Sequence, residues 1–161
     1  MIVRDEGAED AAAIAGVIAR AFAGARHSDG NEARIVAKLR AADALSVSLV
    51  ADDGSVVGYV AFSPVDAAGA QGWFGLGPVA VEPARQGRGI GAALIETGLA
   101  RLRAQGAAGC VVLGDPGYYS RFGFRAQGGL IYAAAPAPYF QALAFAGEPP
   151  TGEVRYHRAF G

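Results

Sequence analysis

The chain has 161 residues, a formal net charge of −1, and a composition that is 52% hydrophobic and 18% charged. These values predict one globular domain over residues 1–161, and they exclude both an intrinsically disordered chain and a basic nucleic-acid-binding protein. Because the chain has a single cysteine, no apolar run long enough for a bilayer and no segment typical of a signal peptide, we expect a cytoplasmic protein that contacts no membrane.

The N-terminal third predicts a strand, two helices and a hairpin. Apolar residues from Ile14 to Phe22 recur every three or four positions, which is the spacing of an amphipathic helix. The pair Asp53-Gly54 between two apolar runs is typical of a type I′ hairpin turn. The expected elements are a strand at residues 2–4, a helix at 14–22, a second helix capped by Asn31, and antiparallel strands at 45–51 and 56–62.

The middle of the chain predicts a strand, a helix and a second strand. The strand Trp73–Val81 precedes a glycine-rich stretch, and a helical pattern then runs from Ile90 to Leu102. The short apolar run Cys110–Leu113 is typical of a strand buried on both faces. A right-handed crossover would place it parallel to Trp73–Val81.

The C-terminal part is less regular. After a turn at residues 114–117, we expect a brief helix carrying Tyr119, and a strand that opens at Phe124. Residues 139–145 are expected to be helical, and residues 153–156 to form a last strand.

The glycine loop, residues 86–92, predicts a phosphate site. Its sequence is Gln86-Gly87-Arg88-Gly89-Ile90-Gly91-Ala92. Glycine removes the Cβ atoms that would hold a ligand away, so amides of the first helical turn can face an anion at the positive end of the helix dipole. A P-loop is excluded because that pattern ends in Gly-Lys-Ser/Thr and the only lysine, Lys38, lies far from the loop.

A dinucleotide-binding fold is a weaker alternative for the same loop. Residues 87–92 satisfy the loose G-x-G-x-x-A pattern, and Asp115 follows the next apolar run. In that fold the strand leads directly into the first glycine, whereas here residues 82–86 separate Val81 from Gly87. This spacing disfavours the dinucleotide interpretation.

Two motifs resemble those of the GNAT N-acetyltransferase family. Residues 86–91 match its Gln/Arg-x-x-Gly-x-Gly/Ala signature after a strand that ends Val-x-Pro. The run Tyr119–Phe124 matches a second signature, Tyr-x-x-x-Gly-Phe, one helix and one strand later. The C-terminal residues 138–143 and 152–160 resemble the extension of a bacterial YhbS-like subgroup.

This resemblance implies an α/β (α+β) fold, with a mixed, mostly antiparallel central sheet of six to seven strands flanked by about four helices. The common core would cover about residues 1–126 and the subgroup extension residues 127–161. The richness in alanine, glycine and arginine is consistent with a bacterial source.

The resemblance also implies an activity: transfer of an acetyl group from acetyl-coenzyme A directly to a primary amine of a small molecule or a peptide. Tyr119 aligns with the tyrosine that protonates the departing thiolate. The residues aligned with the coenzyme-binding segment of the family are Val79, Ala80, Val81, Gln86, Gly87, Arg88, Gly89, Ile90, Gly91 and Ala92. Arg85 is either a second phosphate ligand or a surface residue.

The general base stays open. Many relatives carry a glutamate on the strand before the loop, but residues 73–77 contain no acid, and Val112 stands where many have an asparagine. His27, Glu32 and Asp66 lie in segments that border the acceptor side in this family. Each is a candidate base or a surface polar residue.

These departures leave a second function class open, a non-catalytic module that binds acyl-coenzyme A as a sensor. The spacing of His27, His157 and Cys110 matches no metal-ligand pattern, so we expect no metal site. Exposed apolar residues in the C-terminal extension are compatible with a homodimer.

Overall fold

The computed structural model describes residues 1–25, 28–126 and 129–161. The chain divides into two compact units. The first unit contains Met1–Phe62 and Gly77–Gly98, and the second contains Ser63–Leu76 and Leu99–Gly161. The expectation of a single domain over residues 1–161 stays a prediction.

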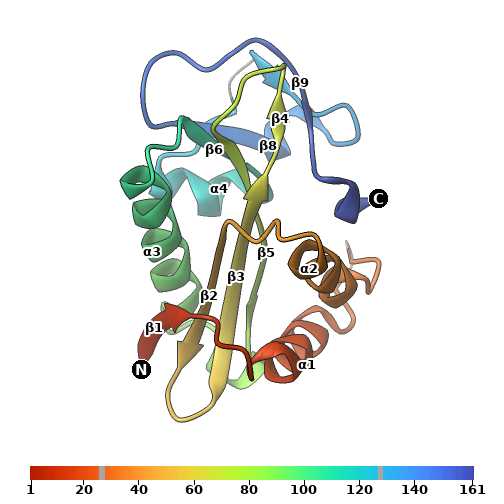
Figure 1. Cartoon of the computed structure of the whole chain (residues 1–161), viewed down its shortest axis with the longest axis vertical. Coiled ribbons are helices and arrows are strands. Elements are labelled where there is room, and N and C mark those ends of the chain that lie inside the picture. The colour runs from red at the N-terminus through yellow and green to blue at the C-terminus, as the bar shows by residue number, and fades with distance from the viewer. Residues whose placement is uncertain (26–27, 127–128) are drawn as a thin grey trace. The chain divides into compact units, whose positions relative to one another are not determined.

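Along the described ranges, two helices follow the first strand, a run of four strands comes next, and two more helices flank the following strand before the last three strands (Figure 1). The helices in the described ranges are α1 (Ala11–Phe22), α2 (Glu32–Ala41), α3 (Ile90–Ala104) and α4 (Pro116–Tyr119). The strands are β1 (Ile2–Asp5), β2 (Val47–Asp52), β3 (Val56–Pro64), β4 (Asp66–Ala67), β5 (Trp73–Val81), β6 (Gly109–Leu113), β7 (Leu130–Ile131), β8 (Phe140–Ala144) and β9 (Gly152–Arg155).

The main sheet has six strands in the order β1-β2-β3-β5-β6-β8, and a small sheet has the order β4-β9-β7. The β1–β2, β2–β3 and β6–β8 pairs are antiparallel and the β5–β6 pair is parallel, so the predicted mixed, mostly antiparallel sheet is confirmed for the described residues. None of the helices in these ranges has the length and apolar character that a membrane span requires.

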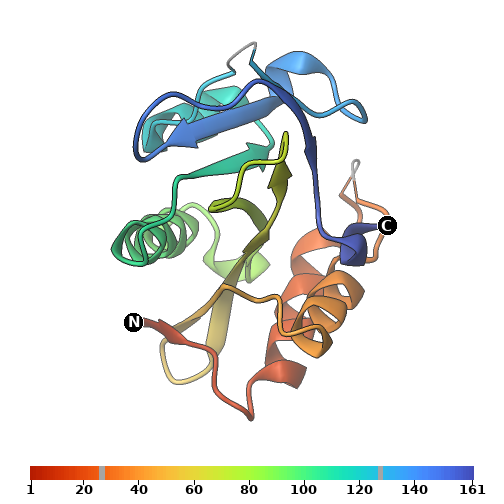
Figure 2. The same cartoon turned by 45° about the horizontal axis from the view of Figure 1, so that its top comes forward.

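The first unit is built on the antiparallel strands β1, β2 and β3. Helices α1 and α2 pack together on one face of these strands, and the beginning of α3 covers the other (Figures 1 and 2). Neighbouring residues of β3 face opposite sides. Tyr59 joins the buried cluster of α1 and α2, whereas a Cβ added to Gly58 would lie 2.9 Å from Cγ2 of Ile90 in α3.

The second unit is built around β6. Its parallel register with β5 runs from Trp73↔Gly109 to Leu76↔Val112, as the crossover argument predicted. On the other side, β6 pairs antiparallel with β8, from Gly109↔Ala144 to Leu113↔Phe140 (Figure 2). Apolar side chains from these strands and the small sheet form one buried cluster, which includes Val65, Trp73, Val111, Phe140 and Val154.

The prediction of a helix at residues 139–145 is wrong, because residues 140–144 form strand β8. Phe, Gln, Ala and Leu are all compatible with a helix on propensity. The backbone of this segment instead completes the hydrogen bonds of β6, and tertiary pairing outweighs the local preference.

Three local expectations also differ from the structure. Strands β2 and β3 are joined by a three-residue loop with an adjacent register shift, not by a two-residue turn. Asn31 precedes α2, but its side chain makes no capping hydrogen bond to a described residue. Near Phe124 the backbone forms only an isolated bridge, between Arg125 and Ala142, rather than a strand.

Candidate active site

The glycine loop connects the end of β5 to the start of α3 within the first unit. A 3-10 turn at Pro83–Arg85 follows β5, and Gln86 begins the loop. The Nε2 atom of Gln86 donates to the carbonyl of Val81 at 3.1 Å. The side chain of Gln86 thus ties the loop to the last residue of the strand.

Gly87 and Gly89 adopt left-handed backbone angles, with φ of +79° and +82°. A Cβ at either position would meet no atom of the described residues within 4 Å, so the space above the loop is open. The carbonyl of Gly89 accepts from the amide of Ala93 at 3.0 Å, which marks the start of the helix. The amides of residues 90–92 therefore have no acceptor within the helix and are available to an anion.

Two ion pairs anchor the segment that leads into this loop. Arg20 of α1 donates from Nε and Nη2 to the two carboxylate oxygens of Glu82, at 2.7 and 2.9 Å. The guanidinium of Arg85 pairs with the carboxylate of Asp53 in the β2–β3 loop, and this hydrogen bond lowers the pKa of Asp53. Arg85 therefore has a structural partner, and exposed Arg88 is the better candidate for a phosphate contact.

The C-terminal half of β5 presents backbone to the same region. The parallel register with β6 ends at Leu76, whereas β5 continues to Val81. Ala80 is buried in the cluster of α1 and α2, and Val79 and Val81 are half-buried. Their side chains are ordinary strand residues, and their main-chain groups are the part that an extended ligand could pair with.

Tyr119 lies in the second unit, at the end of the short helix α4. Asp115 begins this helix, and its Oδ1 accepts from the amide of Gly117 at 2.9 Å. The ring of Tyr119 is 9% exposed and packs edge-to-face against Phe124, with centroids 6.0 Å apart. Burial raises the pKa of Tyr119 to about 12, so its hydroxyl stays protonated at neutral pH.

Comparison with known proteins identifies the family. Residues 13–124 match the model of the Acetyltransferase (GNAT) family. The chain belongs to the GNAT family. The Escherichia coli K12 protein named Uncharacterized N-acetyltransferase YhbS is similar to it, with 44% identity over 127 residues that cover 77% of this chain and 73% of that protein. The expected acetyltransferase and its YhbS-like relationship are confirmed.

Two solved GNAT structures are also similar to this chain. One is a GNAT family acetyltransferase from Brucella melitensis in complex with acetyl-CoA, with 53% identity, a TM-score of 0.89, and coverage of 99% of this chain and 97% of that one. The other is Escherichia coli YhbS in complex with CoA, with 38% identity, a TM-score of 0.89, and coverage of 99% and 91%. These matches confirm the GNAT fold.

The candidate bases of this GNAT chain occupy different surroundings. The carboxylate of Glu32, in the first unit, accepts from the hydroxyl of Ser28 at 2.8 Å. The carboxylate of Asp66, in the second unit, accepts from the amide of Gly69 at 2.7 Å and so stabilises a turn. His27 lies outside the described residues. The role of each as a base stays a prediction.

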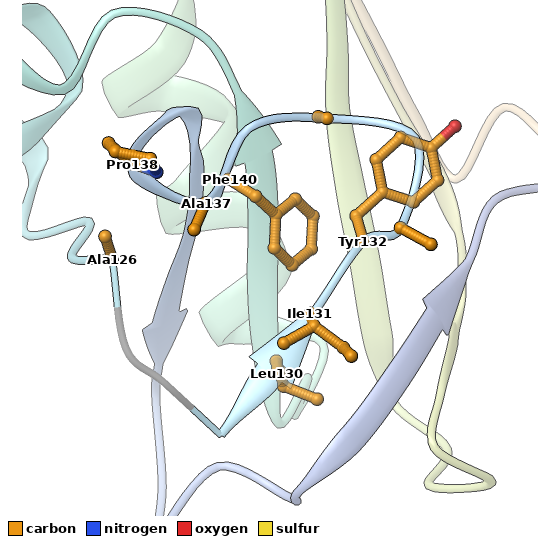
Figure 3. A pocket seen from close by; sticks show the side chains of 9 residues that line it. Ala126, Leu130, Ile131, Tyr132, Ala137, Pro138 and Phe140 are labelled. Atoms are coloured by element: carbon orange, nitrogen blue, oxygen red, sulfur yellow. The ribbon is translucent and has the colours of Figure 1, made fainter.

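The second unit also contains a cavity that the sequence did not reveal (Figure 3). Its volume is about 380 Å³. The labelled side chains that line it are Ala126, Leu130, Ile131, Tyr132, Ala137, Pro138 and Phe140. The cavity is lined by residues of β7 and β8. The sequence predicted a helix at residues 139–145, so it could not predict a cavity that strand β8 helps to form.

A metal site has no basis in the described part of this GNAT chain, where no three His, Cys, Asp or Glu side chains gather. The expected absence of a metal stays a prediction. Cys110 is buried in β6, and burial raises the pKa of its thiol, so the reactive thiolate form is disfavoured.

Proposed function

We propose that this chain transfers the acetyl group of acetyl-coenzyme A to a primary amine of a small molecule or a peptide. The observation that carries the proposal is the open, left-handed glycine loop before the long helix α3, whose first amides have no acceptor within the helix. The Brucella melitensis relative, which was solved with acetyl-CoA, supports the choice of ligand.

The coenzyme would be held mostly by backbone. In this proposal the amides of residues 87–92 bind the pyrophosphate, Gln86 orients the loop, and Arg88 adds a charge-assisted contact. The main chain of Val79, Ala80 and Val81 binds the pantetheine arm as an added strand would. Backbone recognition explains why most of these positions carry small or aliphatic side chains.

The thioester supplies an activated acetyl group, and the chain supplies positioning and protons. The amine nitrogen bonds to the carbonyl carbon, the carbon–sulfur bond breaks, and the departing thiolate takes the proton of the Tyr119 hydroxyl. Because a thiol with a pKa near 8.5 is a stronger acid than a tyrosine with a pKa of about 12, transfer of the Tyr119 proton to the thiolate is uphill by itself. The step balances when the acylated nitrogen gives up its extra proton and the Tyr119 hydroxyl is restored.

The attacking amine must first lose a proton. Keeping a lysine-like amine neutral at pH 7 costs about 4 to 5 kcal/mol, whereas an α-amino group costs only about 1.4 kcal/mol. Among the residues that the structure describes, Glu32 and Asp66 are the candidates to accept that proton through water. An acceptor of low pKa would reduce this demand.

The match to the GNAT model includes residues of both compact units, which supports one catalytic domain over residues 1–161. The cytoplasmic location and the absence of nucleic-acid and membrane partners stay predictions from the sequence, as does a homodimer formed through apolar residues of the C-terminal extension.

The test is Tyr119→Phe, which removes only the proposed proton donor. We expect kcat to fall at least about tenfold with unchanged affinity for coenzyme A, because a positioned acid contributes to the reaction and not to binding. The measurement is thiol release from acetyl-coenzyme A across a panel of amines, with calorimetry for binding.

Tyr59→Phe is the matched control, since it also removes a buried tyrosine hydroxyl, one that lies 2.8 Å from Ser48 in the first unit. It should keep kcat. Full activity of Tyr119→Phe would overturn its role as donor, and coenzyme binding without turnover of any amine by the wild-type chain would favour the sensor instead.

A further inference from the structure

Gln141 is a buried polar residue in an otherwise apolar strand. It lies in β8, is 1% exposed, and has Phe140 and Ala142 as neighbours. Its Nε2 donates to the carbonyl of Gly114 at 3.2 Å. Because burying an amide side chain is costly unless it is hydrogen-bonded, this bond is the feature that accounts for a glutamine here.

Both the amide and the carbonyl of Gly114 are hydrogen-bonded. Its amide donates to the carbonyl of Tyr139 at 2.9 Å, and its carbonyl accepts from Gln141. Gly114 directly follows β6, whose register with β8 ends at Leu113↔Phe140. Strand β8, from the C-terminal extension, therefore fixes the backbone at the point where β6 leads into helix α4.

The ring of Tyr119 rests on this fixed residue. A Cβ added to Gly114 would lie only 2.5 Å from Cε2 of Tyr119, so the ring packs against the bare backbone. The peptide that Gln141 holds joins Gly114 to Asp115, which caps α4 through Gly117. The backbone that the Tyr119 ring packs against and the start of helix α4 therefore both depend on the peptide group between Gly114 and Asp115.

We propose that Gln141 is a positioning residue for Tyr119, acting through Gly114. It does not touch the reacting atoms. By holding the Gly114 carbonyl it keeps the Tyr119 ring, and hence the hydroxyl, in the orientation that protonates the leaving thiolate. The proposal rests on the proposed role of Tyr119, and it gives the C-terminal extension a part in the reaction.

The first test is kinetic. Gln141→Leu should lower kcat about tenfold, as expected for a misplaced acid, and leave the KM for acetyl-coenzyme A unchanged. In the Tyr119→Phe background the same substitution should change kcat less than twofold, because there is no hydroxyl left to position. Equal losses in both backgrounds would overturn the proposal and indicate a structural role.

Val154→Ala is the control for general destabilisation. Val154 is buried in the small sheet, in the apolar cluster of the second unit that includes Phe140 and Ala142, the chain neighbours of Gln141. It should lower stability without the selective loss of kcat. If it lowers kcat as much as Gln141→Leu does at a matched unfolding free energy, the proposal fails.

The second test observes Tyr119 directly and does not depend on activity. The chain is labelled with 3-fluorotyrosine, and the ¹⁹F resonance of Tyr119 is assigned by its disappearance in Tyr119→Phe. Gln141→Leu should shift or broaden this resonance more than those of the other tyrosines, and an unchanged resonance would overturn the proposal. If the resonance moves while Tyr119→Phe keeps full kcat, the donor role is wrong, and a catalytic role for Gln141 fails with it.

A conservative variant separates the hydrogen bond from packing. Gln141→Glu can donate to the Gly114 carbonyl only while its carboxyl is protonated, a form that burial favours. Its kcat relative to wild type should therefore be higher than that of Gln141→Leu at low pH, and the two variants should converge as pH rises. A pH-independent ratio equal to that of Gln141→Leu would contradict the proposal.

Discussion

Gly89 and Gly106 lie just before and just after α3 with nearly the same backbone conformation, φ of +82° and +79°. At both, an added Cβ would meet no described atom within 4 Å. Alanine at either position should therefore cost a similar stability, about 1 to 2 kcal/mol, from left-handed strain alone. Only Gly89→Ala should also weaken acetyl-coenzyme A binding, by about tenfold or more, because its Cβ enters the anion site.

Calorimetry on both variants, with unfolding measured in parallel, checks this expectation. Equal coenzyme affinity in Gly89→Ala and Gly106→Ala would show that the glycine loop does not bind the phosphates.

The loop could be found from sequence because only glycine tolerates its backbone angles. The pairing of Arg85 with Asp53 could not, since the two are far apart in the chain and meet only in the fold.

At the scale of elements, α3 packs closely against β3. A Cβ on Gly98 of α3 would lie 2.1 Å from Cε1 of Phe62, which leaves no room for a methyl group. Alanine normally stabilises a helix by about 1 kcal/mol relative to glycine. We expect Gly98→Ala instead to destabilise the chain by about 1 to 3 kcal/mol in urea unfolding, because the overpacked ring must move.

Gly16→Ala in α1 is the matched comparison. Its Cβ would approach Nη1 of Arg20 at 3.1 Å. This guanidinium is paired with Glu82 but exposed, so it can shift by the small distance needed, and the substitution should stabilise the chain. Phe62→Leu combined with Gly98→Ala should recover part of the lost stability. No recovery in the double variant would contradict the packing explanation.

The elements differ in how well the sequence predicted them. Helix α1 and strands β2, β3 and β5 have a clear apolar period and were expected near their observed bounds. Strand β8 was expected as a helix, because its composition permits either state and its partner β6 lies about thirty residues earlier. Local sequence carries no information on that pairing.

At the scale of the whole molecule, three elements contain residues of both compact units: β3, β5 and α3. Unfolding one unit alone would break a strand or a helix in its middle. We therefore expect a single cooperative transition in calorimetry, with equal calorimetric and van't Hoff enthalpies, and an upward shift of Tm with acetyl-coenzyme A. Two resolved transitions would contradict the prediction of one domain.

The sequence by itself determined the features that depend on local backbone chemistry: the family, the glycine loop from 86 to 92, and Tyr119 as the candidate donor. Glycine spacing, a helix start and a tyrosine four residues before Gly-Phe are all short-range patterns. Only the tertiary structure decided that Arg85 is paired, that residues 140–144 are a strand, and that Gln141 reaches Gly114. Those contacts join residues about thirty positions apart, and their energy arises from pairing and burial, which no local pattern encodes.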